Sequence, residues 1–286
     1  MRQIIILTCM VMAAGACKAG TGKEPGQVDS KEALNKSEQR HEKAVEEAQA
    51  KKKQAETEEK ARADHFIQPP VKAEDLDPAA LVAECARRMG GLDKLRGVKT
   101  ASVRLSLKGS HNLDLHNVVK IPDKARMDYY SGEKILSSVM YDGQQGWQVT
   151  DGEAEKLSET RKRDLLVSMK SDPIPLLLAA TEPGAKLEYL GKTRVVDSDA
   201  HAVKIELPGL AAITFYIDAE DHEFLGSRYE TSQGVTTVIE SDYRDVSGIR
   251  VAHISQIITG STTAVAVIKE VSINSEVSDE TFKPPK

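Results

Sequence analysis

The sequence predicts a mainly β (α+β) protein, in which a large curved antiparallel sheet is covered by helices and preceded by a polar helical tether. Apolar and polar residues alternate with a period of two in several segments after residue 99. Turn-forming dipeptides such as Asp142-Gly143 and Pro208-Gly209 separate these segments. One helical stretch interrupts them between residues 160 and 181. Strands with one solvated face favour antiparallel pairing, and the helical interruption predicts a plug or lid on the sheet.

Composition excludes several classes of protein. The chain has 286 residues, of which 40 % are hydrophobic, 29 % charged and 4 % aromatic, and its formal net charge is −5. This apolar content is too high for a fully disordered chain. The acidic balance and the few aromatic residues argue against nucleic acid as a partner. No apolar run approaches about 18 residues, so the sequence predicts no membrane-spanning helix.

The N-terminus has the pattern of an export signal. Arg2 precedes a short apolar run, which ends in Ala14-Gly15-Ala16-Cys17. This resembles a bacterial lipoprotein signal, with Ala14 where the commonest motif has leucine. The resemblance implies that residues 1–16 are removed and that Cys17 carries the lipid anchor, which makes the membrane a partner. The alternative is an ordinary secretory cleavage site that leaves Cys17 as a free thiol, and both interpretations predict export.

The residue that follows the cysteine is Lys18 rather than an acidic residue. By resemblance to known sorting signals, this residue points to the outer membrane of a two-membrane bacterium. The predicted location is therefore the cell envelope, with the protein facing the periplasm.

Composition divides the rest of the chain into four parts. Residues 17–30 are rich in glycine and form a flexible linker. Residues 31–68 form a charged helical tether, because nine basic and nine acidic residues among 31–64 accompany strong helix formers and few large aliphatics. Residues 69–78 are a proline-containing linker, and residues 79–286 form the β domain. The tether is a spacer in this interpretation; a stalk that binds cell wall or a protein partner is the alternative.

Within the β domain, the pattern predicts particular elements. A helix begins at Pro78 and ends at Gly90-Gly91, and Leu92 to Leu95 add a further turn. About ten or eleven strands follow residue 99. In the helical interruption, one helix covers Arg161 to Met169 and a second follows Pro173. The clearest alternating apolar positions are Ala101, Val103, Leu105 and Leu107; Val203, Ile205 and Leu207; Ile213, Phe215 and Ile217; and Val265, Val267, Val271 and Ile273.

Short motifs resemble the periplasmic lipoprotein-carrier (Lol) superfamily over roughly residues 79–286. They are Lys120-Ile-Pro122-Asp-Lys-Ala-Arg126-Met127, Tyr141-Asp142-Gly143-Gln-Gln-Gly-Trp147, Gly152-Glu-Ala-Glu-Lys-Leu157, Asp172-Pro173-Ile-Pro-Leu176-Leu177 and the ending Val277-Ser-Asp279-Glu-Thr-Phe282-Lys-Pro284. The resemblance implies a strongly curved, incompletely closed antiparallel β-barrel whose concave face holds acyl chains under helices. The chain departs from the soluble carriers at Ile121, where a basic residue is usual, and in its predicted anchor, which receptor-like relatives share.

An acyl-chain site needs a dry apolar cavity, because each buried CH₂ contributes about 0.8 kcal/mol. Adaptable methionine side chains suit a cavity with variable occupancy. The candidate lining residues are Leu105, Met127, Met140, Trp147, Leu166, Met169, Leu177, Leu178, Phe215 and Ile217. The same residues would fill any core between a sheet and helices, and Trp147 suits a packing anchor as well as a ligand platform.

No catalytic or metal-binding motif accompanies these patterns. The sequence has no HExxH, GxSxG or P-loop, so no catalytic residue, metal or cofactor is expected apart from a bound lipid. Cys85 fits a buried helix position better than a nucleophile. The acidic run from Asp218 to Glu223 lacks the ligand order of a calcium loop and fits a solvated turn. The basic run Arg161 to Arg163 fits a solvated helix face, with lipid headgroups as the alternative contact.

The sequence therefore predicts an envelope lipoprotein that binds lipid, or the acyl chains of a lipidated protein, in sorting, transport or reception. The alternative is a non-catalytic module of the same fold that binds proteins or senses envelope conditions. A diffusing carrier needs no anchor, so the tether favours a receptor or sensor.

Overall fold

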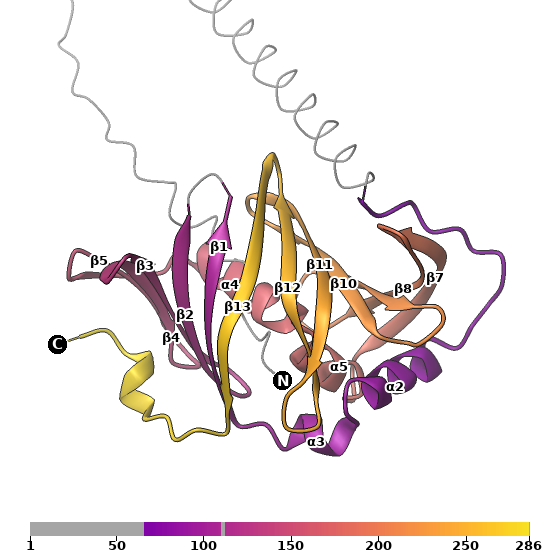
Figure 1. Cartoon of the computed structure of the whole chain (residues 1–286), viewed down its shortest axis with the longest axis horizontal. Helices are drawn as coiled ribbons and strands as arrows, with labels where there is room; N and C mark the ends of the chain where they lie inside the picture. The colour runs from indigo at the N-terminus through magenta and orange to yellow at the C-terminus, as the bar shows by residue number, and fades with distance from the viewer. Residues whose placement is uncertain (1–65, 110–111, 286) are drawn as a thin grey trace, which may run out of the picture.

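The computed structural model describes residues 66–109 and 112–285 (Figure 1). Its thirteen strands form one antiparallel sheet, in the order β6-β5-β4-β3-β2-β1-β13-β12-β11-β10-β9-β8-β7. Two consecutive meanders are joined because β13 pairs with β1. The edge strands β6 and β7 do not pair with each other, so the sheet curls without closing. The mainly β, incompletely closed fold predicted from the sequence is confirmed.

The first meander consists of β1 (Thr100–Lys108), β2 (Leu113–Lys120), β3 (Lys124–Ser131), β4 (Lys134–Tyr141), β5 (Gly146–Thr150) and β6 (Glu153–Lys156). The second consists of β7 (Lys186–Val195), β8 (Ser198–Glu206), β9 (Ile213–Asp218), β10 (Phe224–Thr231), β11 (Gly234–Asp245), β12 (Arg250–Thr259) and β13 (Thr262–Ile273). The expected ten or eleven strands are thus thirteen. A strand without alternating apolar residues is not recognised from the sequence pattern. This applies to β6, because all four of its residues are exposed.

The helices are α2 (Pro78–Arg88), α3 (Leu92–Arg96), α4 (Glu159–Ser171), α5 (Pro173–Ala180) and the 3₁₀ helix η2 (Asp279–Phe282). All four predicted helical segments are present. The α2 helix begins where Asp77 accepts a hydrogen bond from the Ala79 N–H at 2.9 Å. It ends before Gly90, whose φ is +123° and where a Cβ atom would lie 2.6 Å from the Gly248 oxygen.

Helices α4 and α5 lie against one face of the sheet, behind strands β12 and β13 in the view of Figure 1. We call this the helix face and the opposite one the outer face. On β1 the alternation holds as predicted, since Ala101, Val103, Leu105 and Leu107 are each at most 2 % exposed and belong to the core on the helix face.

On β13 the predicted apolar stripe is wrong in part. Ala264, Ala266 and Ile268 face the core, whereas Val265 and Val267 lie on the outer face. The register shifts opposite Arg104 and Leu105 of β1. This bulge inserts one residue and reverses which side chains face the core, so only Val271 and Ile273 of the predicted stripe pack against it.

The structure also changes the role of the predicted linker. Ile67 pairs with Val195 and Val71 pairs with Lys192 of edge strand β7. Ile67 is 2 % exposed and belongs to a second, smaller core on the outer face. Gly191 permits this approach, because a Cβ atom there would lie 2.5 Å from the Val71 backbone. Contact with the sheet therefore begins at Phe66, ahead of the predicted boundary at residue 79.

The closing segment packs on the outer face of the first meander. Asp279 of η2 pairs with Lys120 at 2.6 Å and with Lys124 at 2.9 Å. The pair holds the pKa of Asp279 at about 2, mainly through hydrogen bonds from the two lysines. Phe282 is fully buried beside them in the same turn.

The predicted signal, Cys17 and the tether up to residue 65 lie outside the described residues. In the part of the chain that is described, none of the helices has the length and apolar character to cross a membrane.

Candidate functional site

Helices α4 and α5 form the insertion that separates the two meanders. Ser158 begins α4 by accepting a hydrogen bond from the Arg161 N–H at 3.3 Å. Pro173 occupies the first turn of α5, where its missing N–H has no cost. The α5 sequence is almost entirely apolar, and six of its eight residues are buried. Helix α5 therefore presents apolar side chains on nearly every side.

Eight of the ten predicted lining residues meet in the core on the helix face. Six of them are fully buried members of that core: Leu105, Met127, Met169, Leu177, Phe215 and Ile217. Leu166 and Leu178 are half-buried and pack against it. Residues from β1, β3, β9, α4 and α5 are thus brought together as the prediction requires.

Met140 and Trp147 are not part of this group. Val139 and Tyr141 belong to the core on the helix face, so Met140 between them points to the outer face. Trp147 pairs in register with Met140 and lies on the same side. These two residues therefore lie on the outer face, away from the predicted cavity.

The interior between the helices and the sheet is filled by side chains. The six fully buried residues of the group are each at most 4 % exposed. The helix face is therefore closed in this conformation, and a ligand could enter only if α4 and α5 moved away from the sheet.

A buried carboxylate ties α4 to the second meander. Asp164 accepts a hydrogen bond from the Ser232 N–H at 3.0 Å and another from the Ser232 hydroxyl. Ser232 lies in the turn between β10 and β11. We call this contact the α4 latch. Sequence reasoning missed it, because only the fold brings Asp164 next to a turn that lies 68 residues later.

A second buried carboxyl lies where α4 meets α5. Asp172 occupies the N-cap position of α5, yet its side chain makes no capping hydrogen bond. Burial raises its pKa well above the usual range, and the nearby Glu240 raises it further. Glu240 lies on β11, where Ser255 of β12 donates a hydrogen bond to it at 2.6 Å. The sequence contained a signal for Glu240, since it occupies a core position in the alternation Thr236, Val238, Glu240.

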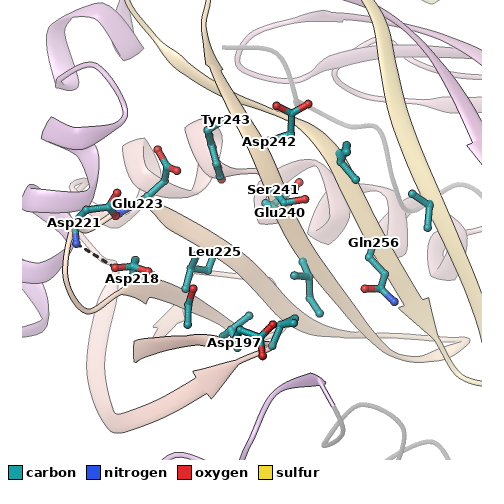
Figure 2. Close-up of a pocket in the computed structure, with 16 residues that line it drawn as sticks. Asp197, Asp218, Asp221, Glu223, Leu225, Glu240, Ser241, Asp242, Tyr243 and Gln256 are labelled. Atoms are coloured by element: carbon teal, nitrogen blue, oxygen red, sulfur yellow. Dashed lines mark hydrogen bonds between the residues drawn. The ribbon is translucent and has the colours of Figure 1, made fainter.

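The outer face carries a cleft of about 550 Å³, shown in Figure 2. It lies between the turns at Asp197 and Asp218 and strands β11 to β13, with Leu225, Ile239 and Ile254 among its apolar lining. Most carboxylates at its rim already have partners. Asp221 pairs with Arg88 at 2.8 Å, Glu223 with Arg250 at 2.5 Å and Asp242 with Arg244 at 2.5 Å.

The acidic run from Asp218 to Glu223 forms a turn, as the sequence indicated. Asp218 accepts hydrogen bonds from the backbone N–H groups of Glu220 and Asp221 at 2.8 and 3.1 Å. Its carboxylate is therefore used to close the turn. Among the described residues, no group of three acidic, histidine or cysteine side chains is arranged to hold a metal ion.

A serine–histidine pair also lies on the outer face. The Ser102 hydroxyl and His116 Nε2 are 2.8 Å apart. Asp128, paired with His116 in register, is bound instead by Arg126 and Ser138. Ser102 lies in a strand that pairs on both sides, so its neighbouring N–H groups belong to the sheet. The arrangement thus lacks the free donors that stabilise an oxyanion. Burial lowers the pKa of His116, with Arg104 as the next cause.

Cys85 is fully buried on α2, as predicted. Burial raises the pKa of its thiol, and Glu223 and Asp221 raise it further. A protonated, enclosed thiol is a weak nucleophile. Cys85 therefore acts as a small apolar core residue.

Known structures share this architecture. A DUF1329 family protein from Desulfovibrio piger superposes with a TM-score of 0.52 at 11 % identity, over 73 % of this chain and 98 % of that one. The chain has the same fold. A LolA superfamily protein from Nitrosomonas europaea matches with a TM-score of 0.49 at 8 % identity, over 73 % and 98 % of the two chains. A lipoprotein-sorting domain from Vibrio parahaemolyticus matches with 0.49 at 9 %, over 72 % and 95 %.

No family model and no curated protein matches the sequence. At 11 % identity, the likeness to the Desulfovibrio piger protein concerns the fold.

Proposed function

We propose that this protein is an envelope lipoprotein whose domain binds lipid, or the acyl chains of a lipidated protein, between the sheet and helices α4 and α5. The observation that carries the proposal is the helix pair itself. A two-helix insertion whose second helix is almost entirely apolar covers the face of an unclosed sheet, and eight aliphatic, methionine and phenylalanine side chains predicted for a cavity meet there. The role is binding rather than catalysis.

Binding requires the helix pair to act as a lid. Its connections are short: Leu157 and Ser158 precede α4, and residues 181–185 follow α5. Gly184 in the second connection has a φ of +99°, a conformation that glycine adopts without strain. Opening must break the α4 latch and the hydrogen bond that Arg161 of α4 donates to Gln148 of β5. An acyl chain would then replace side-chain contacts in the core, with about 0.8 kcal/mol for each buried CH₂.

The experiment that tests the proposal is mass spectrometry of lipids that co-purify with the chain. The protein begins at Lys18, so that no lipid attached to Cys17 can contribute, and it is produced in bacteria and washed free of detergent. Stoichiometric phospholipid or acyl chains are the expected result. A stable, folded protein without lipid that also fails to take up a fluorescent fatty acid would contradict the proposal.

The proposal includes the anchor at Cys17 and a location at the outer membrane, facing the periplasm. The charged residues from 31 to 65 then separate the domain from the membrane. Such a placement fits a receptor that accepts lipid or lipoprotein better than a carrier that diffuses.

The cleft on the outer face favours a second candidate, a module that binds a protein partner or senses envelope conditions. Its apolar lining offers a docking surface independent of the lid, with Val196 exposed at its edge. Ile239→Asp would remove a partner from envelope pull-downs in this case and leave lipid content unchanged. Loss of lipid with the partner retained would contradict the second candidate.

A further inference from the structure

The cleft on the outer face combines an apolar floor with an acidic rim (Figure 2). The floor crosses four neighbouring strands, β10 to β13, and its apolar side chains are Leu225, Ile239, Ile254 and Val265. Three spacings of about 4.8 Å between strands make this floor about 14 Å wide, which is the length of about four residues of extended chain. The cleft is therefore large enough for a short segment of polypeptide.

The rim of the cleft is negatively charged. Six acidic residues line the cleft, and none of the lining residues that the structure describes is basic. Arginine side chains from outside the cleft pair with three of the six, which are Asp221, Glu223 and Asp242. Asp197 and Asp218 form no ion pair with a lysine or arginine among the described residues, and Asp197 is exposed in the turn between β7 and β8. The rim therefore keeps negative charge that attracts a cationic group and repels an anionic one.

Val196 at the edge of the cleft has an unfavourable backbone conformation for its residue type. It lies in the two-residue turn between β7 and β8, its φ is +53°, and it is 47 % exposed. A β-branched residue is uncommon at positive φ, where glycine or asparagine has less steric strain. The turn would form more readily with either of these residues, so the fold itself does not require valine here. Contact with a ligand in the cleft accounts for an exposed apolar side chain at this position.

We propose that this cleft binds a segment of a partner protein in which basic residues flank a short apolar stretch. The apolar residues of the segment would lie on the floor, and its lysine or arginine side chains would reach Asp197 and Asp218. The same charges disfavour an acidic peptide and an anionic membrane surface. The inference rests on the second candidate function, for which it names the chemistry of the partner, and it is independent of lipid binding on the helix face.

The test begins with selection of peptides from a random phage-displayed library on the immobilised chain from Lys18 onward. The selected peptides are expected to carry at least two basic residues next to apolar ones. Fluorescence anisotropy of a labelled selected peptide should show binding that weakens as salt is added, because salt screens the charges at the rim. Selection of acidic or purely apolar peptides, or of no peptide that binds, would overturn the inference.

A charge reversal at the rim tests the electrostatic part of the proposal. Asp197→Lys replaces an attraction by a repulsion at an exposed site, so it is expected to weaken binding of the selected peptide at least about fivefold. Asp199→Lys is the matched control, because it changes the net charge by the same amount. Ala200 belongs to the core on the outer face, so its neighbour Asp199 points to the other side of β8. Equal weakening by the two variants would contradict binding in the cleft.

Replacement of Val196 tests the apolar part without a change of charge. Asparagine tolerates positive φ, so Val196→Asn should keep the unfolding temperature measured by circular dichroism, while peptide binding weakens at least about threefold. Val71→Asn is the control, since Val71 is an exposed valine outside the cleft, and it should bind the peptide as the wild type does. Unchanged binding by Val196→Asn would overturn the inference.

Lipid content and molecular mass separate this inference from the other proposals. Asp197→Lys should leave the lipid that co-purifies with the chain unchanged. A wild-type protein that binds the peptide but carries no lipid would contradict lipid binding alone, whereas one that carries lipid but binds no basic peptide would overturn this inference alone. A dimer that Asp197→Lys dissociates, detected by light scattering, would assign the cleft to a second copy of the chain and would also overturn it.

Discussion

On the helix face, residues of the same type differ in burial and in hydrogen bonding, because the fold gives them different neighbours. Leu177 and Leu178 follow each other on α5, yet only Leu177 is fully enclosed. Asp164 and Asp172 are both buried acids of the helix pair, but Asp164 has two hydrogen bonds from Ser232 and Asp172 lacks a partner for Oδ2. Residue type alone does not separate these cases, and each leads to a measurable difference.

Truncation of Leu177 should destabilise the domain strongly. We expect Leu177→Ala to lower the free energy of unfolding by about 2–5 kcal/mol, because it leaves a cavity in a packed core. Leu178→Ala is the matched control and should cost less, since that side chain is half-buried. Urea unfolding followed by circular dichroism measures both values, and equal losses would contradict the burial described for the two residues.

Asp172 should make stability depend on pH in the opposite sense from Asp279. The pKa of Asp172 is raised by burial and by Glu240, so the folded state holds its proton more tightly than the unfolded state. Its contribution to stability is therefore present below the unfolded pKa, near 3.8, and lost as the pH rises toward the folded pKa. Asp172→Asn should stabilise the protein more at pH 7 than at pH 4.

Asp279 provides the comparison for this measurement. Its pKa is lowered to about 2 by Lys120 and Lys124, so its contribution is present above pH 3.8 and lost as the pH falls toward 2. Asp279→Asn should therefore lower the free energy of unfolding more at pH 7 than at pH 3. Unfolding curves at several pH values measure both effects, and the same sign for the two variants would contradict this assignment.

Among the elements, the α4–α5 pair has a composition that suits a lid. It packs on the sheet mainly through apolar side chains, and its described polar tie to the second meander is the α4 latch. Strands β11 and β12, by contrast, pair over nine positions in register. Local opening should therefore separate the helices from the sheet more readily than it separates these strands.

Removal of the α4 latch should loosen the helix pair selectively. Asp164→Ala leaves the Ser232 N–H without its acceptor, so we expect faster amide exchange over residues 159–180 and unchanged exchange in β1 to β3. Asp114→Ala is the control, because it removes an exposed ion pair with Lys269. Uniformly faster exchange across the sheet would indicate general destabilisation and contradict a latch that acts on the lid.

For the whole molecule, the proposed function requires both a closed domain and an anchor. The domain depends on the pairing of β13 with β1, which joins the two meanders into one sheet. The anchor depends on Cys17, far from the sheet along the chain. The two parts should therefore be separable by a single substitution.

Replacement of the anchor residue should release the protein from membranes. In cells, Cys17→Ser is expected to prevent lipidation and to move the protein from the membrane pellet to the soluble envelope fraction. Replacement of Cys85 by serine is the comparison, since that thiol is buried in α2 and should not affect membrane association. Continued pelleting of Cys17→Ser after a salt wash would contradict lipid anchoring at this residue.

Much of the fold could be predicted because its signals are local. The alternation of Ala101, Val103, Leu105 and Leu107 identifies a half-buried strand within nine residues. Pro78 and Gly90 mark the limits of a helix through their own backbone preferences. Such patterns depend on neighbours along the chain, so composition and spacing are sufficient to recognise them.

The candidate site could be predicted only in part, because faces are decided by register. Met127 and Met140 are equally apolar in sequence, but pairing places Met127 on the helix face and Met140 on the outer face. The bulge opposite Arg104 likewise reverses the faces along β13. A shift of one residue moves every side chain to the other side, and no local pattern records such a shift.

Local patterns in the sequence were sufficient to predict the mainly β class, the position of the helical insertion and eight of the candidate residues on the helix face. The closure of the helix face and the two hydrogen bonds from Ser232 to Asp164 depend on the tertiary fold. These contacts join parts of the chain separated by 68 residues. They exist because two meanders curl around one helix pair, and chain neighbours alone cannot specify which distant side chains then come together.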